Sequence, residues 1–125
     1  MKRYIFLLLI NFCSISIFAQ TGKNEKAIMQ VLDQQIIAWN KGDIEGFMQG
    51  YWKDEALTFV GTQGPQYGWE TTFNRYKTTY NSPEKMGSLK FDILKMERHK
   101  RKTYQVLGRW YLTRTVGDVG GAFTW

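Results

Sequence analysis

W-N-K-G-D-I-E-G-F-M-Q-G-Y-W-K-D-E-A-L-T-F-V-G, residues 39–61, is the stretch that decides the fold of this chain. Gly42 ends one helix, and Asp43 is placed to cap the start of a second, because its carboxylate can accept hydrogen bonds from free backbone N–H groups. The second helix carries apolar side chains on one face and is followed by a polar turn and a strand over 57–60. Two helices that lead into a strand predict a helix-lined sheet with an apolar interior.

Apolar spacing extends this pattern in both directions from the stretch. It predicts a first helix over 24–40, the end of the second helix near Trp52, and a third helix from Trp69 to just before Pro83. The third helix carries four aromatic residues on one face: Trp69, Phe73, Tyr76 and Tyr80. Such spacing over several turns is typical of a helix that packs against a core.

The segments between and after the helices predict loops and strands. Glycine and proline content predicts a loop over 61–68 and a turn over 117–121. Aromatic and β-branched content predicts three further strands, over 89–98, 104–116 and 122–125. The sequence therefore predicts one α+β domain from Gln20 onward, and 125 residues leave no room for a second.

Residues 1–19 have the features of an export signal. Two basic residues are followed by an apolar run over 4–12 and by the small residue Ala19. We expect cleavage between Ala19 and Gln20, export to the periplasm or the medium, and no membrane span after cleavage. The alternative is an uncleaved membrane anchor, although the run is short for one.

Cleavage would change both the cysteine content and the charge of the chain. It would remove Cys13, the only cysteine, so the mature domain would depend on its core alone. It would also lower the net charge from +6 to +4, with basic residues concentrated at 98–102. That run is either a patch for nucleic acid or anionic membrane, or a solvated hairpin tip. We favour the hairpin tip and expect no nucleic-acid partner, because aromatic residues are not interleaved with the run.

The last residues have the alternating pattern of a strand that stops early. Phe123, Thr124 and Trp125 are not the polar residues that usually end a domain. We expect the sequence to be a shortened form of a longer domain with an unfinished sheet edge.

The order of these elements resembles the nuclear transport factor 2-like superfamily, in particular its SnoaL-like and domain-of-unknown-function members. The resemblance is carried by 38–43, 57–60, 68–69, Tyr76 and 108–110. It implies a cystatin-like cone, in which a strongly curved mixed sheet has about three helices on its concave face and encloses an apolar pocket. It also implies a homodimer formed through the outer face of the sheet, and a last strand that is missing here.

Aromatic residues from separate elements form the main candidate site. In such a cone they would converge on one cavity and bind a small apolar or aromatic molecule, oriented by Tyr hydroxyl and Trp N–H groups. The alternative is plain core packing. Arg114, at the expected pocket mouth, could meet an anionic group. The predicted ligand-binding residues are Trp39, Tyr51, Phe59, Trp69, Tyr76, Trp110 and Arg114.

Groups for catalysis are few in this sequence. His99, the only histidine, falls in the basic run, where nothing is expected to orient it as a general base. Residue counts exclude a cysteine–histidine zinc site, no phosphate loop or dinucleotide motif occurs, and no cofactor or metal is predicted. By resemblance, the position of the proton-abstracting aspartate of steroid isomerases falls near Phe59. Phenylalanine cannot accept a proton, so isomerase chemistry of that type is not expected. Asp92 is the one catalytic candidate, and it faces either the pocket or water.

These patterns predict an exported small-molecule-binding domain whose reaction, if it has one, is not determined. The first alternative is a SnoaL-like lyase, isomerase or hydrolase that uses Asp92 together with a tyrosine. The second alternative is a module for dimerisation or protein interaction.

Overall fold

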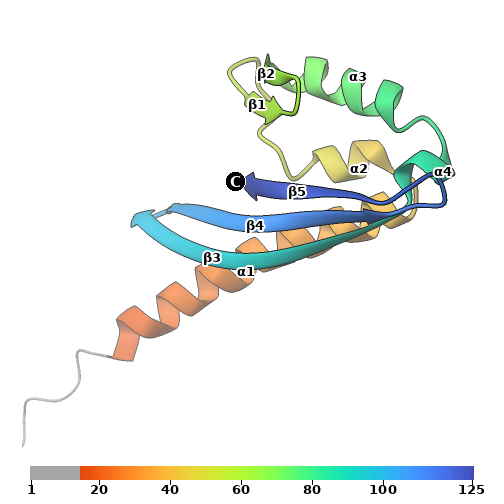
Figure 1. Cartoon of the computed structure of the whole chain (residues 1–125). Helices are drawn as coiled ribbons and strands as arrows, with labels where there is room; N and C mark the ends of the chain where they lie inside the picture. Colours follow the sequence, from red (N-terminus) through yellow and green to blue (C-terminus); the bar gives the residue numbers. More distant parts are fainter. Residues whose placement is uncertain (1–14) are drawn as a thin grey trace, which may run out of the picture.

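The computed structural model describes residues 15–125, which combine helices with antiparallel strands (Figure 1). In chain order the elements are α1 (Ile15–Asn40), α2 (Ile44–Met48), β1 (Thr58–Gly61), β2 (Gly64–Tyr67), α3 (Trp69–Thr79), α4 (Pro83–Met86), β3 (Ser88–Lys100), β4 (Thr103–Thr113) and β5 (Val119–Thr124). The predicted α+β class is confirmed.

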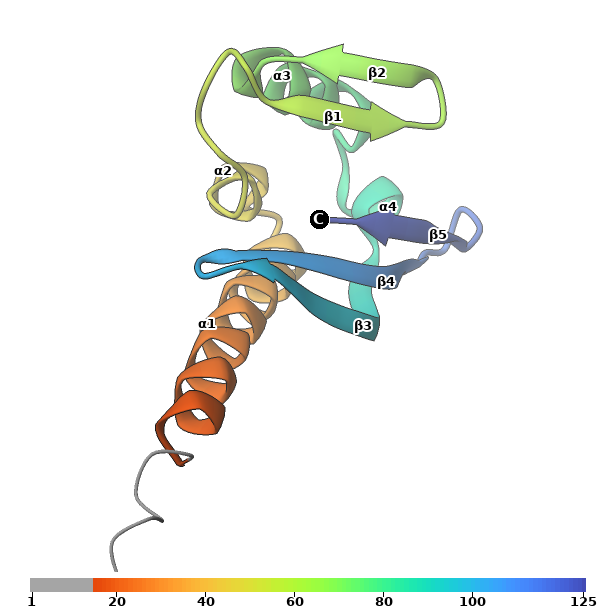
Figure 2. The same cartoon turned by 90° about the vertical axis from the view of Figure 1, so that its left-hand side faces the viewer.

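The described strands form two units in place of one continuous mixed sheet. β3, β4 and β5 pair in that order, β1 pairs with β2, and every pair is antiparallel. α1 packs against β3, whereas α3 lies with the β1–β2 hairpin beyond β5. Figure 2 shows β1 and β5 facing each other across the interior, with α2 to one side. The helices and strands thus surround a common interior, as the predicted cone requires.

The end of α1 is fixed to α4 and to the start of β3 by side-chain hydrogen bonds. The indole N–H of Trp39 donates to the Met86 carbonyl at 3.1 Å. The amide of Asn40 accepts from the Leu89 N–H at 2.8 Å and donates to the Leu89 carbonyl at 3.4 Å. Asn40 therefore pairs with the start of β3 much as a neighbouring strand would, which sets the position of α1 on the sheet.

The transition from α1 to α2 follows the predicted signals. Gly42 has a φ of 78°, a conformation that glycine adopts at little cost. The Asp43 carboxylate accepts from the Gly46 N–H at 2.8 Å and caps α2. α2 is shorter than predicted, because it ends at Met48 and not near Trp52.

The buried core lies between the helices and the three-stranded sheet. Its apolar members are Leu32, Trp39, Phe47, Met48, Trp69, Met86, Leu89, Val106 and Leu112. They come from the four helices of residues 15–125 and from β3 and β4, so burial of these side chains holds the helices against the three-stranded sheet.

The prediction of a loop over 61–68 is wrong, because this segment contains β2 and forms a hairpin with β1. A two-residue connection joins Gly61 to Gly64, and Gly64 has a φ of 97°. Pro65 lies opposite Val60 in a strand that pairs on one side only. Proline is tolerated at such an edge because its missing N–H is not needed there.

The turn predicted over 117–121 is shorter than expected, because β5 begins at Val119. A Cβ atom at Gly120 would lie 2.8 Å from the Trp110 carbonyl oxygen, and one at Gly121 would lie 3.0 Å from the indole nitrogen of Trp110. These glycines therefore allow β5 to approach the backbone and ring of Trp110, a role that turn propensity does not reveal.

α1 begins at Ile15, earlier than the predicted start near 24. Most of the expected export signal, including Cys13, lies outside the described residues, so its cleavage stays a prediction. Within residues 15–125, no helix combines the length and hydropathy needed to cross a membrane.

Candidate functional site

A cleft of about 1160 Å³ opens between β1, α3 and the three-stranded sheet, with contributions from α1, from α2 and from the chain that follows α2. Its lining is mainly apolar and aromatic. Five of the predicted ligand-binding residues line it: Trp39, Tyr51, Phe59, Tyr76 and Trp110. The structure thus brings together rings that are distant in the sequence, around a space large enough for a small molecule.

Four of these rings, together with the ring of Phe47, contact one another and form a continuous aromatic wall, made of Trp39, Phe47, Tyr51, Phe59 and Tyr76. The ring centroids of Tyr51 and Phe59 are 6.0 Å apart, those of Phe59 and Tyr76 are 5.7 Å apart, and those of Phe47 and Tyr76 are 5.4 Å apart. Trp39 meets Phe47 edge-on at 5.0 Å. The sequence presents core packing and cleft lining as alternatives, but the same rings do both: they pack against one another and also line the cleft.

Three tyrosine hydroxyls of the cleft lining are neutral at ordinary pH. Burial raises the pKa of Tyr51 from 10.0 to about 12, and hydrogen bonds with Tyr76 and Gln35 offset part of this rise. Burial also raises the pKa of Tyr76 well above its usual value, and the neighbouring tyrosines add to it. Burial raises the pKa of Tyr80, against the opposing charges of Arg114 and Arg75. The three hydroxyls can therefore donate and accept hydrogen bonds, but none supplies a phenolate base.

The raised pKa of Tyr51 predicts a loss of stability in alkali. Above about pH 10 Tyr51 of the unfolded chain loses its proton, whereas folded Tyr51 keeps it up to about pH 12. The contribution of Tyr51 to the free energy of unfolding is therefore fully present below about pH 10 and is lost as the pH rises to about 12. Between about pH 9 and about pH 11, the free energy of unfolding of Tyr51→Phe should fall by about 1 kcal/mol less than that of wild type. Urea denaturation at both pH values measures this difference. Tyr67→Phe, at an exposed site, is the control, and equal losses in Tyr51→Phe and wild type would contradict the assignment.

Trp69 lies outside the cleft lining and belongs to the core. Its indole N–H donates to the Met48 carbonyl at 2.9 Å, and its ring lies 5.0 Å from that of Phe73. The ammonium group of Lys53 lies 4.6 Å from its ring centroid. The aromatic stripe of α3 is therefore divided, because its first half packs near α2 and only Tyr76 and Tyr80 reach the cleft.

Arg114 also lies outside the lining. Its guanidinium donates to the Gly117 carbonyl at 2.7 Å and to the Lys85 carbonyl at 3.3 Å, which holds the β4–β5 turn next to α4. The charged side chain that does line the cleft is Arg75, on α3. We expected an arginine at the pocket mouth, and the structure provides one from a different element.

Asp92 lies opposite Arg109 in the β3–β4 register. Its neighbour Phe91 lines the cleft and Asp92 does not, as alternation along a strand requires. This placement gives no support to a reaction in which Asp92 acts on a bound molecule.

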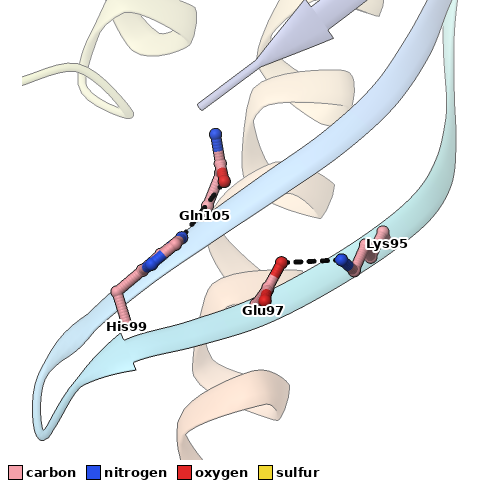
Figure 3. Close-up of polar contacts among 4 residues, drawn as sticks. All are labelled: Lys95, Glu97, His99 and Gln105. Carbon is pink, nitrogen blue, oxygen red and sulfur yellow. Dashed lines mark hydrogen bonds and ion pairs between the residues drawn. The ribbon is translucent and has the colours of Figure 1, made fainter.

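The basic run 98–102 forms the tip of the β3–β4 hairpin, as predicted. Figure 3 shows His99 and Gln105 meeting across this hairpin, with Nε2 of His99 3.1 Å from Oε1 of Gln105. The expectation that nothing orients His99 is therefore wrong. On β3, Lys95 pairs with Glu97 at 2.7 Å. This exposed group of residues lies away from the cleft, because no residue of 95–105 lines it.

The polar residues of the cleft that sequence reasoning missed include Gln35 and Arg75. Gln35 is buried, and its amide donates to the Phe47 carbonyl at 3.1 Å. Its signal was an amide placed on the apolar face of α1, four residues before Trp39. For Arg75, the sequence signal was that no acidic residue lies three or four positions away on the helix to pair with it. Positions 71, 72, 78 and 79 are all threonine.

Comparison with known proteins identifies the family. No protein-family model and no curated protein matches the chain. The crystal structure of an NTF-2-like protein of unknown function from Shewanella oneidensis MR-1 shares 37% identity, covers 80% of this chain and 83% of that chain, and has a TM-score of 0.76. A domain of unknown function with a cystatin-like fold from Nostoc punctiforme shares 19% identity over 82% of this chain and 67% of that chain, with a TM-score of 0.63, and supports the fold alone. The chain belongs to the NTF-2-like family.

Proposed function

We propose that this protein binds a small apolar or aromatic molecule in the cleft between the aromatic wall and the three-stranded sheet. The observation that carries the proposal is the cleft of about 1160 Å³, with its lining of rings from α1, β1, α3 and β4. Ligand sites in proteins are concave, mostly apolar and equipped with a few polar groups that fix orientation.

The chemical groups of the lining favour binding over proton transfer. They are aromatic rings, aliphatic side chains, tyrosine hydroxyls that stay neutral, threonine hydroxyls, the Gln35 amide and the Arg75 guanidinium. Stacking on the rings would hold a flat molecule, and the hydroxyls would orient its polar atoms. We therefore propose a binding domain without assigning a reaction.

Thermal denaturation in the presence of a panel of apolar and aromatic compounds tests the proposal. A compound that binds the folded state, present at about a hundredfold excess over its Kd, should stabilise the protein by about 2.7 kcal/mol. Leu107→Glu should need at least a tenfold higher ligand concentration for the same stabilisation, because it adds a carboxylate to the apolar lining.

Leu94→Glu is the matched control for this substitution. Leu94 is 48% exposed and Leu107 is 40% exposed, both lie in the β3–β4–β5 sheet region, and only Leu107 lines the cleft. The proposal fails if no compound stabilises the protein, or if the two variants respond to a bound compound in the same way.

We also propose that the protein acts after export, on the basis of the leader-like residues 1–19. N-terminal sequencing of the protein recovered from outside the inner membrane should find Gln20 first. A chain that keeps Met1, or that stays in the cytoplasmic fraction, would contradict this.

A further inference from the structure

Arg75 lies where the apolar cleft meets a second, polar recess. The recess has a volume of about 510 Å³ and is lined by polar residues of α3 and of the β1–β2 hairpin. Four residues line both spaces: Thr62, Arg75, Thr79 and Tyr80. A molecule whose apolar part occupied the cleft could therefore reach the guanidinium of Arg75 with a polar end.

One nitrogen of the Arg75 guanidinium lacks a hydrogen-bond partner within the described part of the protein. Its Nη1 atom is buried and makes no hydrogen bond there. Among the side chains that the structure describes, none of the cleft or recess residues is an aspartate or glutamate, and the ion pair found is that between Lys95 and Glu97 on the distant hairpin. Arg75 as a residue is half-buried, and a cation that is partly removed from water without a counter-charge favours an anion as its partner.

The surroundings of Arg75 leave room for its planar group and for a ligand. A Cβ atom at Gly61 would lie 3.2 Å from Nη1 and 3.4 Å from Nη2, so glycine at this position lets the guanidinium lie against β1. The other buried polar atom without a described partner, Oε1 of Gln66, lines the same recess. The two unsatisfied atoms, one donor and one acceptor, therefore share one polar space at the edge of the apolar cleft.

We propose that the molecule bound in the cleft is an apolar or aromatic carboxylic acid, and that its carboxylate pairs with the guanidinium of Arg75. Arginine presents a rigid fork of N–H donors that matches a carboxylate, and its pairing is stronger away from water. A water molecule held by the carboxylate, or a hydroxyl group of the ligand, would donate to Gln66. This inference depends on the proposed function, because it specifies the class of molecule that the cleft accepts.

Calorimetric titration of the full chain with naphthoate and with naphthamide, two probes of the same shape that differ in charge, tests the inference. Wild type should bind naphthoate at least about tenfold more tightly than naphthamide. Arg75→Gln should abolish this preference, mainly by weakening the binding of naphthoate. Arg75→Lys should keep part of the preference, because it keeps the charge and loses the fork. Lys77→Gln, an exposed cation on the same helix that lines neither space, should keep all of it.

The outcomes separate this inference from the proposed function. Equal affinity of wild type for both probes would overturn the carboxylate assignment and leave small-molecule binding standing, and this result needs no variant to fold. If neither probe nor any other apolar compound binds, both proposals fail. Without ligand, Arg75→Gln should be at least as stable as wild type, because it removes a half-buried charge that has no ion-pair partner among the described residues. A marked loss of stability would instead assign Arg75 a structural role and would contradict the inference.

Discussion

Replacement of Trp39 by alanine should lower the free energy of unfolding by about 3–5 kcal/mol, the range found for loss of a buried large aromatic side chain. Trp39 is only 3% exposed, and its ring contacts those of Phe47, Tyr76 and Tyr80. The substitution also leaves the buried Met86 carbonyl without its donor. Since domains of this size are stable by only about 5–15 kcal/mol, a large part of the population should unfold under mild denaturation.

Urea denaturation followed by far-ultraviolet circular dichroism measures this loss without relying on tryptophan fluorescence. Trp52→Ala is the control, because Trp52 is 63% exposed and its loss should change stability by no more than about 0.5 kcal/mol. Trp39→Phe should fall between the two, since it keeps a ring and removes the N–H donor to Met86. If Trp39→Ala and Trp52→Ala were equally stable, Trp39 would not be the centre of the core.

The parts of the fold that follow from local chemistry could be predicted from the sequence. Gly42 and Asp43 mark the end of one helix and the start of the next because their preferences act within a few residues, and the structure confirms both. The β3–β4 hairpin follows in the same way from two long strand-like segments around a basic tip. These features need no knowledge of what packs against them.

The errors lie where a distant contact decides the structure. Pro65 and three glycines favour a loop, but pairing with β1 makes a strand of the same segment. Gly120 and Gly121 favour a turn, but the close approach of β5 to Trp110 requires glycine inside a strand. The propensity of a residue indicates which backbone conformations it tolerates, but it does not indicate which distant neighbour will require one of them.

The candidate site shows the same division between local and distant information. Helical spacing places Trp69 and Tyr76 on one face of α3, yet only the position of α2 determines that Trp69 is buried and Tyr76 reaches the cleft. For Arg114 the sequence supplied the charge but not its partners, which are backbone carbonyls. Aromatic composition therefore predicts a pocket of this kind more readily than it predicts which polar side chains enter it.

Replacement of Gly87 by alanine should also lower the free energy of unfolding by about 3–5 kcal/mol, for a reason that concerns the backbone. Gly87 joins α4 to β3 with a φ of 60° and a ψ of −154°, a conformation nearly restricted to glycine and costly for other residues by about 1–3 kcal/mol. A Cβ atom would also overlap the backbone oxygen of Thr113 and lie 2.5 Å from Cγ of Arg114. Because the next residue, Ser88, pairs with Thr113, relief of this overlap must displace the first pair of the β3–β4 ladder.

Gly42→Ala separates the two contributions to this loss. Gly42 has a φ of 78°, and a Cβ atom added to it would have no neighbouring atom within 4 Å, so its substitution tests backbone conformation without overlap. It should cost only about 1–2 kcal/mol, as for other residues held in the left-handed region. Urea denaturation gives both values, and hydrogen exchange at the start of β3 should rise in Gly87→Ala alone. Equal losses for the two variants would show that α4 can move aside, and that the junction does not hold β3 and β4 in register.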